Sequence, residues 1–257
     1  MPSRPCVVLT REPSDNRGLM GHLRSLGVPC REIPCTRTVL LGGGTVPEGA
    51  AAVAFSSRRA VRGFSTELCS LLQGENPPLV ASVGPATTEE LAQRHHRVDL
   101  EAQPHTGRAL AELLDSQLRP GLPVLVPQGD VGGGELVSRL AELERPFLPH
   151  VVYQNVAPNF EPIEPFPVAA VFVAAPSAAR RLIAHYPWIA QAPFLPIGPT
   201  THAALEELGV RRFLGPIEAP GQGVDWRLWT QRRQADILAA AWREHASSIP
   251  DDPDFQR

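Results

Sequence analysis

The chain has 257 residues, of which 43% are hydrophobic and 20% charged, and its formal net charge is −3. This length suits one large domain or two of about 100 to 150 residues, and the near-neutral charge argues against a broad nucleic-acid-binding surface. All 24 cationic side chains are arginines, because the sequence contains no lysine, which excludes enzymes that need a Schiff-base or phosphate-loop lysine.

The sequence carries no signal for a membrane segment or for a bound metal. No apolar run approaches the roughly 18 to 20 residues that span a bilayer, and the N-terminal residues lack the pattern of a signal peptide, so we expect a cytosolic protein. The four cysteines form no C-x-x-C pair, and Cys30 with Cys35 has no nearby pair of histidines, so no metal site is expected.

Three apolar runs in the first half of the chain each lead into a polar turn and then into a helical spacing of apolar residues. The first predicted strand covers residues 6–10, the second 51–55 and the third 79–83. Each is short enough for a strand and is followed by a longer amphipathic segment, so the first half predicts an alternation of strands and helices.

The second half of the chain repeats this order, with strands predicted at 123–126, at 169–173 and around residue 197. The three pairs of matching blocks are separated by offsets of 117, 118 and 114 residues. Three matches in one order indicate an internal duplication. Strands that alternate with helices through short turns predict parallel sheets with helices on both faces, so the expected fold class is α/β with two similar parallel-sheet domains.

Functional residues are expected in the turns after these strands, because ligands of parallel sheets bind at the carboxyl ends of the strands, where helix N-termini present free N–H groups. The turns hold mostly hydroxyls and glycines: Thr10, Ser56, Ser57, Gly84, Thr87, Gly129, Ser177, Gly198, Thr200 and Thr201. Each of these residues could serve only to cap a helix. As a repeated set they favour an anion-binding face, and they suit holding carboxylates better than breaking bonds.

Two further side chains are candidates for contact with a ligand. Arg11 directly follows the first strand and could clamp a carboxylate with two hydrogen bonds, although an ordinary surface arginine fits as well. Tyr153 ends a predicted strand beside a proline-rich connection, so its phenol either faces a cleft or packs in the core. No Ser-His-Asp order or pair of carboxylates stands out. The residues by themselves predict a two-domain α/β protein that binds a polyanion.

Seven short motifs follow, in order, the pattern of one known family. They are Val8-Leu-Thr-Arg11, Phe55-Ser-Ser57, Val83-Gly-Pro-Ala-Thr87, Val126-Pro-Gln-Gly129, Val152-Tyr153, Ala175-Pro-Ser177 and Ile197-Gly-Pro-Thr-Thr201. In these motifs the chain resembles uroporphyrinogen-III synthase over about residues 6 to 210. The resemblance implies two flavodoxin-like domains joined by a two-stranded hinge near residues 33–39 and 151–156. One domain would hold residues 1–36 plus 168–257, and the other residues 37–167.

The activity that the resemblance implies is a step of haem biosynthesis. The linear tetrapyrrole hydroxymethylbilane is cyclised to uroporphyrinogen III, with loss of water and inversion of its last ring, ring D. Catalysis would depend on orientation and electrostatics rather than on a nucleophile, and no cofactor is implied. Carried over by position, Arg11 and the hydroxyl and glycine turns would bind the carboxylates or pyrroles of the substrate, and Tyr153 would assist the leaving hydroxyl. We expect a monomer with no nucleic-acid or membrane partner.

Two departures from the family pattern keep alternatives open. Ala174-Ala175 stands where the family usually has Thr-Ser, and the end of the chain from Gly221 to Trp226 lacks the usual closing pattern. One alternative is a non-catalytic relative that binds a tetrapyrrole or acts in regulation. Another is a two-lobed binding protein for a different acidic metabolite.

Overall fold

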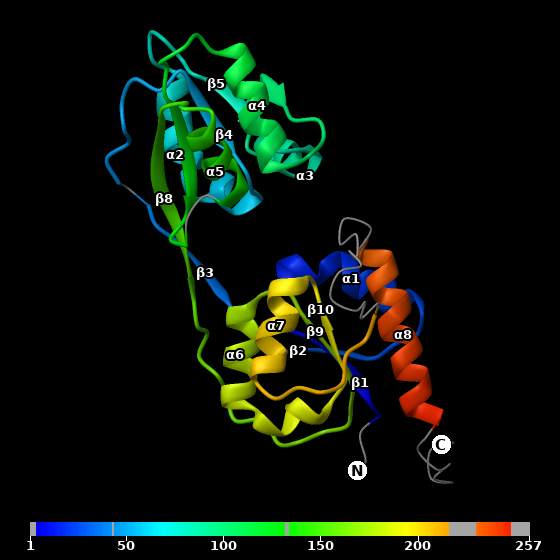
Figure 1. The fold of residues 1–257 in the computed structure, drawn as a ribbon. Helices are drawn as coiled ribbons and strands as arrows, with labels where there is room; N and C mark the ends of the chain where they lie inside the picture. The colour runs from blue at the N-terminus through cyan, green and yellow to red at the C-terminus, as the bar shows by residue number, and fades with distance from the viewer. Residues whose placement is uncertain (1–3, 43, 132–133, 216–229, 248–257) are drawn as a thin grey trace. The chain divides into compact units, whose positions relative to one another are not determined.

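The computed structural model describes residues 4–42, 44–131, 134–215 and 230–247. The C-terminal departure noted above, at residues 221–226, lies outside these ranges. The chain divides into two compact units, which are drawn in Figure 1. Unit 1 combines Met1–Arg37 with Ala157–Arg257, and unit 2 is Thr38–Val156.

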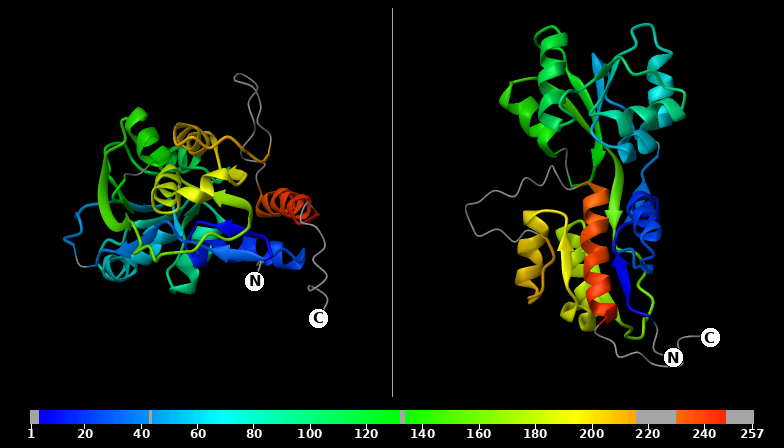
Figure 2. Two further views of the ribbon diagram at one scale, coloured as in Figure 1. Left: turned by 90° about the horizontal axis from the view of Figure 1, so that it is seen from below. Right: turned by 90° about the vertical axis from the view of Figure 1, so that its right-hand side faces the viewer.

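Unit 1 contains a four-stranded parallel sheet in the order β10-β9-β1-β2. Its elements in chain order are β1 (Cys6–Leu9), α1 (Pro13–Ser25), β2 (Cys30–Glu32), β9 (Val168–Val173), α6 (Pro176–His185), the 3-10 helix η1 (Pro187–Gln191), β10 (Phe194–Pro196), α7 (Pro199–Glu207) and α8 (Gln231–Ser247). Helices α1 and α8 pack together on one face of the sheet, and α6 and α7 on the other, as the views in Figures 1 and 2 show. Both faces of this sheet are therefore covered, as a parallel sheet requires.

Unit 2 contains a six-stranded sheet in the order β3-β8-β7-β4-β5-β6, in which β4 to β8 pair in parallel. Its elements in chain order are β3 (Arg37–Leu40), β4 (Ala52–Phe55), α2 (Arg58–Leu72), β5 (Leu79–Ser82), α3 (Pro85–Gln93), β6 (Leu100–Glu101), α4 (Gly107–Gln117), β7 (Val124–Gly129), α5 (Gly134–Glu142) and β8 (Phe147–Val156). Helices α2 and α3 cover one face, and α4 and α5 cover the other. The predicted α/β fold with two parallel-sheet units is confirmed.

The sequence repeat falls on equivalent strands of the two sheets. In unit 1, Val7 on β1 lies opposite Cys30 on β2. In unit 2, Val124 on β7 lies opposite Phe147 on β8, and both residues stand 117 positions after their unit 1 counterparts. Strands β9 and β10 correspond to β4 and β5 in the same way, so the order β10-β9-β1-β2 matches β5-β4-β7-β8. Because a slip of one residue turns every side chain to the opposite face, equal register means that equivalent residues face equivalent helices.

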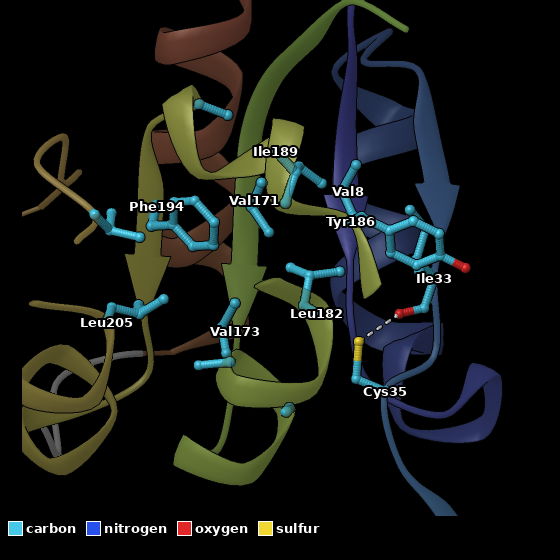
Figure 3. Close-up of a cluster of buried hydrophobic side chains, with 14 of the residues drawn as sticks. Val8, Ile33, Cys35, Val171, Val173, Leu182, Tyr186, Ile189, Phe194 and Leu205 are labelled. Carbon is cyan, nitrogen blue, oxygen red and sulfur yellow. Dashed lines mark hydrogen bonds between the residues drawn. The ribbon is translucent and has the colours of Figure 1, made fainter. Parts of the chain in front are cut away.

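Alternating apolar residues allow each strand to bury both of its faces. In unit 1, Val7 and Leu9 face α1 and α8, whereas Val8 faces α6 and α7. Figure 3 shows the cluster of buried side chains between the sheet and helices α6 and α7, in which Leu182 on α6 and Phe194 on β10 are both fully buried. Full burial of a side chain of this size contributes about 1.5 to 3 kcal/mol. The packed cores therefore fix the strand ends, where the predicted site residues lie.

The boundary expected at residue 167 lies earlier in the structure, because unit 1 already includes the segment that starts at Ala157. This segment is rich in proline and reads as a linker in the sequence. In the structure Phe160 packs against the core of unit 1, and the hydroxyl of Tyr186 donates a 2.6 Å hydrogen bond to the carbonyl of Glu161. Aromatic contacts rather than regular secondary structure attach the segment to unit 1.

Candidate functional site

The predicted site residues lie at the carboxyl end of the sheet in each unit. In unit 1 they follow β1, β9 and β10, and comprise Thr10, Arg11, Ser177, Gly198, Thr200 and Thr201. In unit 2 they follow β4 and β5 or lie near the ends of β7 and β8, and comprise Ser56, Ser57, Gly84, Thr87, Gly129 and Tyr153. Because the strands that carry them are parallel within each sheet, each set shares one edge of its own sheet.

Thr10 and Arg11 follow β1 directly but differ in exposure. Thr10 is 1% exposed, and its hydroxyl donates a 2.9 Å hydrogen bond to the carbonyl of Phe172 on β9. Its side chain therefore joins two strands of unit 1. Arg11 is partly exposed, with its guanidinium carbon 6.0 Å from the centre of the Phe172 ring. Of the two residues, Arg11 is the one placed to reach a carboxylate.

Helices α6 and α7 begin with residues that cannot cap them through a side chain. The N-cap of α6 is Ala175 and that of α7 is Gly198, and each is followed by a proline. Neither N-cap carries a side-chain oxygen, so it takes none of the N–H groups of the first turn. Ser177 and Thr200 are exposed in these turns, whereas Thr201 is buried. The edge of unit 1 therefore offers an anion two helix N-termini with hydroxyls beside them.

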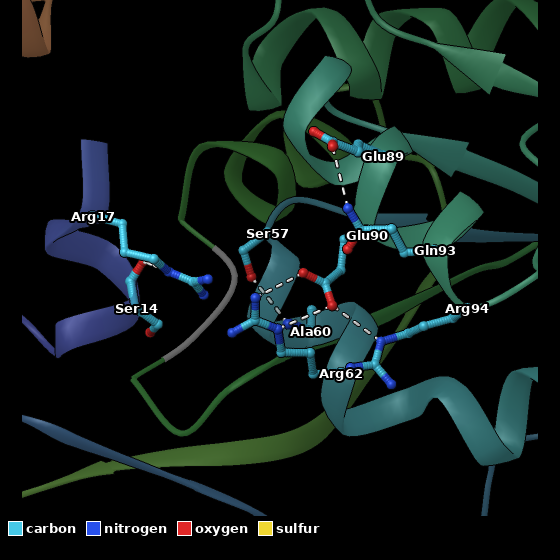
Figure 4. A network of polar contacts seen from close by, with 9 residues as sticks. All are labelled: Ser14, Arg17, Ser57, Ala60, Arg62, Glu89, Glu90, Gln93 and Arg94. Atoms are coloured by element: carbon cyan, nitrogen blue, oxygen red, sulfur yellow. Dashed lines mark hydrogen bonds and ion pairs between the residues drawn. The ribbon is translucent and has the colours of Figure 1, made fainter. Parts of the chain in front are cut away.

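Helix α2 in unit 2 begins differently. Its N-cap is Ser57, whose Oγ accepts a 3.2 Å hydrogen bond from the backbone N–H of Ala60, as Figure 4 shows. The capping role that the sequence left open is therefore real for Ser57. A capping oxygen acts as an acceptor, so the hydroxyl hydrogen stays available as a donor. Ser56, the residue before the cap, is partly buried.

The turn after β5 depends on a glycine. Gly84, the N-cap of α3, has a φ of +156°, and a Cβ atom at this position would lie 2.8 Å from the Cβ of His105. Thr87 in the first turn of α3 is buried. The Nδ1 atom of His105 lies 2.8 Å from the carbonyl of Ala102, so Nδ1 carries the hydrogen and donates it. His105 therefore lies exposed against this turn with a fixed tautomer.

Like His105, a second group at this edge is not indicated by the sequence pattern. The hydroxyl of Thr88 donates a hydrogen bond to a carboxylate oxygen of Glu101 and lies 2.6 Å from the Oγ of Ser82. Glu101 ends β6, a strand of two residues that is too short to give an alternating pattern. The signal that could have found it is the helix start after it, where Thr106 caps α4. The edge of unit 2 thus includes a carboxylate, which can accept N–H donors from a ligand.

Tyr153 lies on β8 directly opposite Gly129 on β7. Its side chain is partly buried and packs against the cluster under α2. Gly129 is closely approached by the phenol ring, because a Cβ atom there would lie 2.6 Å from Cε2 of Tyr153. The structure therefore brings these two predicted site residues together and places them at the same edge as Ser57.

An ion-pair network behind this edge joins α2 to α3. Glu90 on α3 accepts a 2.8 Å hydrogen bond from Nη2 of Arg62 and a 3.1 Å hydrogen bond from Nε of Arg94 (Figure 4). The hydrogen bonds from Arg62 are the main reason why the pKa of Glu90 lies below its usual value. Next to this network, His96 pairs with Ser65 at 2.8 Å, and burial lowers the pKa of the imidazole. These contacts hold two helices whose N-termini form part of the edge.

The described residues contain no group of three or more His, Cys, Asp or Glu side chains that could hold a metal ion. None of the helices in the described ranges is long and apolar enough to cross a membrane. The groups present at the two edges are backbone amides, hydroxyls, a guanidinium, an imidazole, a carboxylate and a phenol. Such groups bind anions and transfer single protons.

Comparison with known proteins decides the family. The family model described as uroporphyrinogen-III synthase HemD matches residues 19–220. The chain belongs to this uroporphyrinogen-III synthase family. The match runs from within α1 to beyond α7, so it spans every strand-end turn described above except the turn after β1.

Two solved structures share the fold. The uroporphyrinogen-III synthetase of Helicobacter pylori aligns over 81% of this chain and 91% of its own, with 18% identity and a TM-score of 0.56. A mutant uroporphyrinogen III synthase from the extremely thermophilic bacterium Thermus thermophilus aligns over 94% of this chain and 98% of its own, with 16% identity and a TM-score of 0.50. A comparison with curated proteins gives no match. At these identities the two structures establish a common fold, and the family match carries the assignment.

Proposed function

We propose that this protein cyclises hydroxymethylbilane to uroporphyrinogen III. The observation that carries the proposal is the match to the uroporphyrinogen-III synthase family over residues 19–220. The chemistry of the edges supports it. A substrate with eight carboxylates needs hydrogen-bond donors, which Arg11 and the N-termini of α6 and α7 supply.

The proposed reaction releases one water molecule and consumes nothing else. The nitrogen of the terminal pyrrole expels the hydroxyl, so the C–O bond of the hydroxymethyl group breaks and an electrophilic azafulvene forms. The substituted carbon of ring D attacks that centre, which makes a C–C bond and a spiro intermediate. The bond from this carbon to the methylene bridge of the neighbouring ring then breaks, and that methylene forms a new bond to the unsubstituted α carbon of ring D, which inverts the ring. The proton lost when the macrocycle closes balances the departed hydroxide as water.

The main task of the protein is to fold the substrate, because the substrate can expel its own hydroxyl. Holding reacting groups at contact distance and in the right orientation supplies a large part of many enzymatic rate enhancements. In this proposal Ser177 and Thr200 bind carboxylates beside the helix N-termini of unit 1, and Ser57 donates from unit 2. Thr10 and Thr201 are buried, so they support the turns from below.

Tyr153 is the proposed proton donor to the leaving hydroxyl. A positioned general acid contributes about 10²- to 10⁴-fold. We therefore expect Tyr153→Phe to lower kcat for uroporphyrinogen III within that range and to leave KM nearly unchanged. Tyr186→Phe is the matched control, because the Tyr186 hydroxyl bonds Glu161 inside unit 1, and this variant should keep the wild-type rate. A wild-type rate and isomer ratio for Tyr153→Phe would remove Tyr153 from the mechanism.

The isomer of the product tests the function itself. Hydroxymethylbilane is generated enzymatically and incubated with the purified chain, and isomers I and III are separated by chromatography after oxidation. Formation of isomer III supports the proposal. Isomer I alone, at the rate of the protein-free control, contradicts it and favours the non-catalytic relative, for which the missing hydroxyls at Ala174-Ala175 are the motivating observation.

The proposal includes a monomer that acts in the cytosol without a cofactor. Support for the last point is that the reaction balances without an oxidant, a reductant or a group donor. Full activity after extensive dialysis against a chelator, together with the sedimentation coefficient of a 27.8 kDa particle, would agree with it. A dimer at the assay concentration or a loss of activity on dialysis would contradict it.

A further inference from the structure

The strand that carries Tyr153 is irregular one residue before it. Gln128 on β7 lies opposite Val151 on β8, but the next residue, Gly129, lies opposite Tyr153. Val152 is therefore the extra residue of a β-bulge. Bulges bend a strand and re-aim its side chains, and they are over-represented next to active sites.

The bulge brings the phenol of Tyr153 to the α2 face of the sheet. Successive residues of a regular strand point to opposite faces. Val152 is 1% exposed and belongs to the cluster under α2, and Tyr153 packs against the same cluster. Two neighbours in the chain thus face the same helix. In a regular strand Tyr153 would point to the opposite face, which α4 and α5 cover.

The phenol ring of Tyr153 packs directly against the backbone of Gly129. A Cβ atom at Gly129 would lie 2.6 Å from Cε2, 2.8 Å from Cζ and 3.0 Å from the hydroxyl oxygen of Tyr153. The backbone around the ring is held as well. The N–H of Asp130 donates to the carbonyl of Tyr153 at 3.1 Å, and Oδ1 of Asp130 accepts from the N–H of Asn155 at 3.3 Å. The backbone here is held by hydrogen bonds, whereas the ring can rotate about its side-chain bonds. A side chain at position 129 would therefore displace the ring rather than the backbone.

We propose that Gly129 is a positioning residue that, together with the bulge at Val152, sets the hydroxyl of Tyr153 for proton transfer. The proposal rests on the function proposed above. It gives Gly129 a role other than substrate contact, since the space above its Cα is taken by the phenol. It also explains why a glycine stands at a position where the backbone itself does not require one, because no left-handed φ occurs there.

The position of the ring can be measured without turnover. The chain has two tyrosines, Tyr153 and Tyr186, so ring-¹³C-labelled tyrosine gives two NMR signals, which Tyr153→Phe assigns. Gly129→Ala is expected to shift the Tyr153 signal and to leave the Tyr186 signal in place. Gly42→Ala is the control, because a Cβ atom there meets nothing within 4 Å, and it should shift neither signal. An unmoved Tyr153 signal in Gly129→Ala overturns the proposal.

Kinetics then test whether the displaced hydroxyl matters. Gly129→Ala is expected to lower kcat for isomer III by about tenfold or more, with little change in KM. In the Tyr153→Phe background the same change should cost nothing further, because the hydroxyl is already absent. Losses that multiply in the double variant would overturn the proposal. If the wild-type chain makes no isomer III, the proposed function fails, but the NMR shift still reports on the steric contact.

A second pair of variants covers the case in which Gly129→Ala does not fold. Tyr153→Ala removes the ring and with it the clash. Adding Gly129→Ala to Tyr153→Ala is therefore expected to leave the melting temperature of Tyr153→Ala unchanged. A further large loss of stability in this double variant would show that position 129 clashes with something other than the ring, which overturns the proposal.

Discussion

The two units share four strands in one order and one register, yet the helices that follow the equivalent strands β4 and β9 begin differently. Ser57 caps α2, whereas Ala175, 118 residues later, begins α6 without a side-chain acceptor. A helix start that is capped by its own serine has one N–H group fewer for a ligand. Ala175, which in the sequence looks like a lost contact, therefore leaves the N-terminus of α6 more available to a ligand than that of α2.

The units also differ in the contacts that hold their loops, which are an ion pair in unit 2 and aromatic contacts in unit 1. In unit 2 the guanidinium of Arg145 binds Asp115 near the end of α4. In unit 1 the centroid of the Phe166 ring lies 5.2 Å from that of Trp188. The guanidinium carbon of Arg31 lies 4.3 Å from the centre of the same Phe166 ring. Ion pairs between Arg and carboxylates weaken when the carboxylate is protonated, whereas aromatic packing does not. The two units should therefore respond differently to acid and to the loss of a charge.

The largest expected effect comes from removing the buried cation of unit 2. The side chain of Arg145 is 4% exposed, and its guanidinium donates to Oδ1 of Asp115 and to the carbonyl of Arg119, both at 2.7 Å. Arg145→Ala leaves these acceptors unpaired and should lower the free energy of unfolding of unit 2 by about 3 kcal/mol. All four tryptophans belong to unit 1, so the loss should appear in circular dichroism of urea unfolding before tryptophan fluorescence changes.

An exposed arginine of unit 1 provides the control for this variant. Arg180 pairs with Glu207 at 3.5 Å, and both side chains are more than half exposed. Arg180→Ala is expected to cost less than about 1 kcal/mol. If Arg180→Ala and Arg145→Ala lowered the free energy of unfolding equally, the proposed difference between the contacts of the two units would be wrong.

The stabilities of the two units should depend differently on acid because of Glu90 in unit 2. Because the pKa of Glu90 is lowered in the folded state, its contribution is complete above the usual value of 4.5 and is lost as the pH falls through the lower, folded value. Unit 2 should therefore lose about 1 to 2 kcal/mol from this residue under acid. Glu90→Gln should flatten that part of the pH profile. Parallel acid profiles for the variant and the wild type would rule Glu90 out as the cause.

The smallest expected effects concern the two helix starts. Ser57→Ala removes the cap of α2 and should destabilise unit 2 by about 1 kcal/mol. Ala175→Ser supplies the equivalent cap to α6 and should stabilise unit 1 by a similar amount. If free N–H groups at α6 bind a carboxylate, Ala175→Ser should also raise KM. Calorimetry and steady-state kinetics measure the two quantities, and a lower KM for Ala175→Ser would contradict the interpretation of the helix start.

Much of the fold follows from local patterns that the sequence displays openly. Apolar runs such as 51–55 and 169–173 are buried on both faces of a sheet, so they stay apolar throughout, and the duplication makes each one visible twice. Strand β6 was not predicted, because two residues carry no periodicity. The segment that starts at Ala157 belongs to unit 1, although its prolines are typical of a linker. The sequence does not show this, because the contact that holds the segment joins Phe160 to His185, which is distant in the chain.

The candidate site was predictable only in its outline. The position of a residue after a parallel strand places it at an edge, which local sequence reveals for Ser57 and Ser177 alike. Exposure depends on packing from distant elements, so the burial of Thr10 under Phe172 could not be read from the turn itself. A bulge is a mismatch between two strands, and neither strand of the pair at Gly129 shows it alone.

The central proposal is that residues at the carboxyl edge of each unit bind the substrate. The most direct test is an NMR titration of the ¹⁵N-labelled chain with uroporphyrinogen III under reducing conditions. We expect amide shifts at Ser177 and Thr200 in unit 1 and at Ser57 and Gly84 in unit 2. Shifts confined to one unit, or found at the opposite ends of the strands around Leu79 and Ala169, would contradict it.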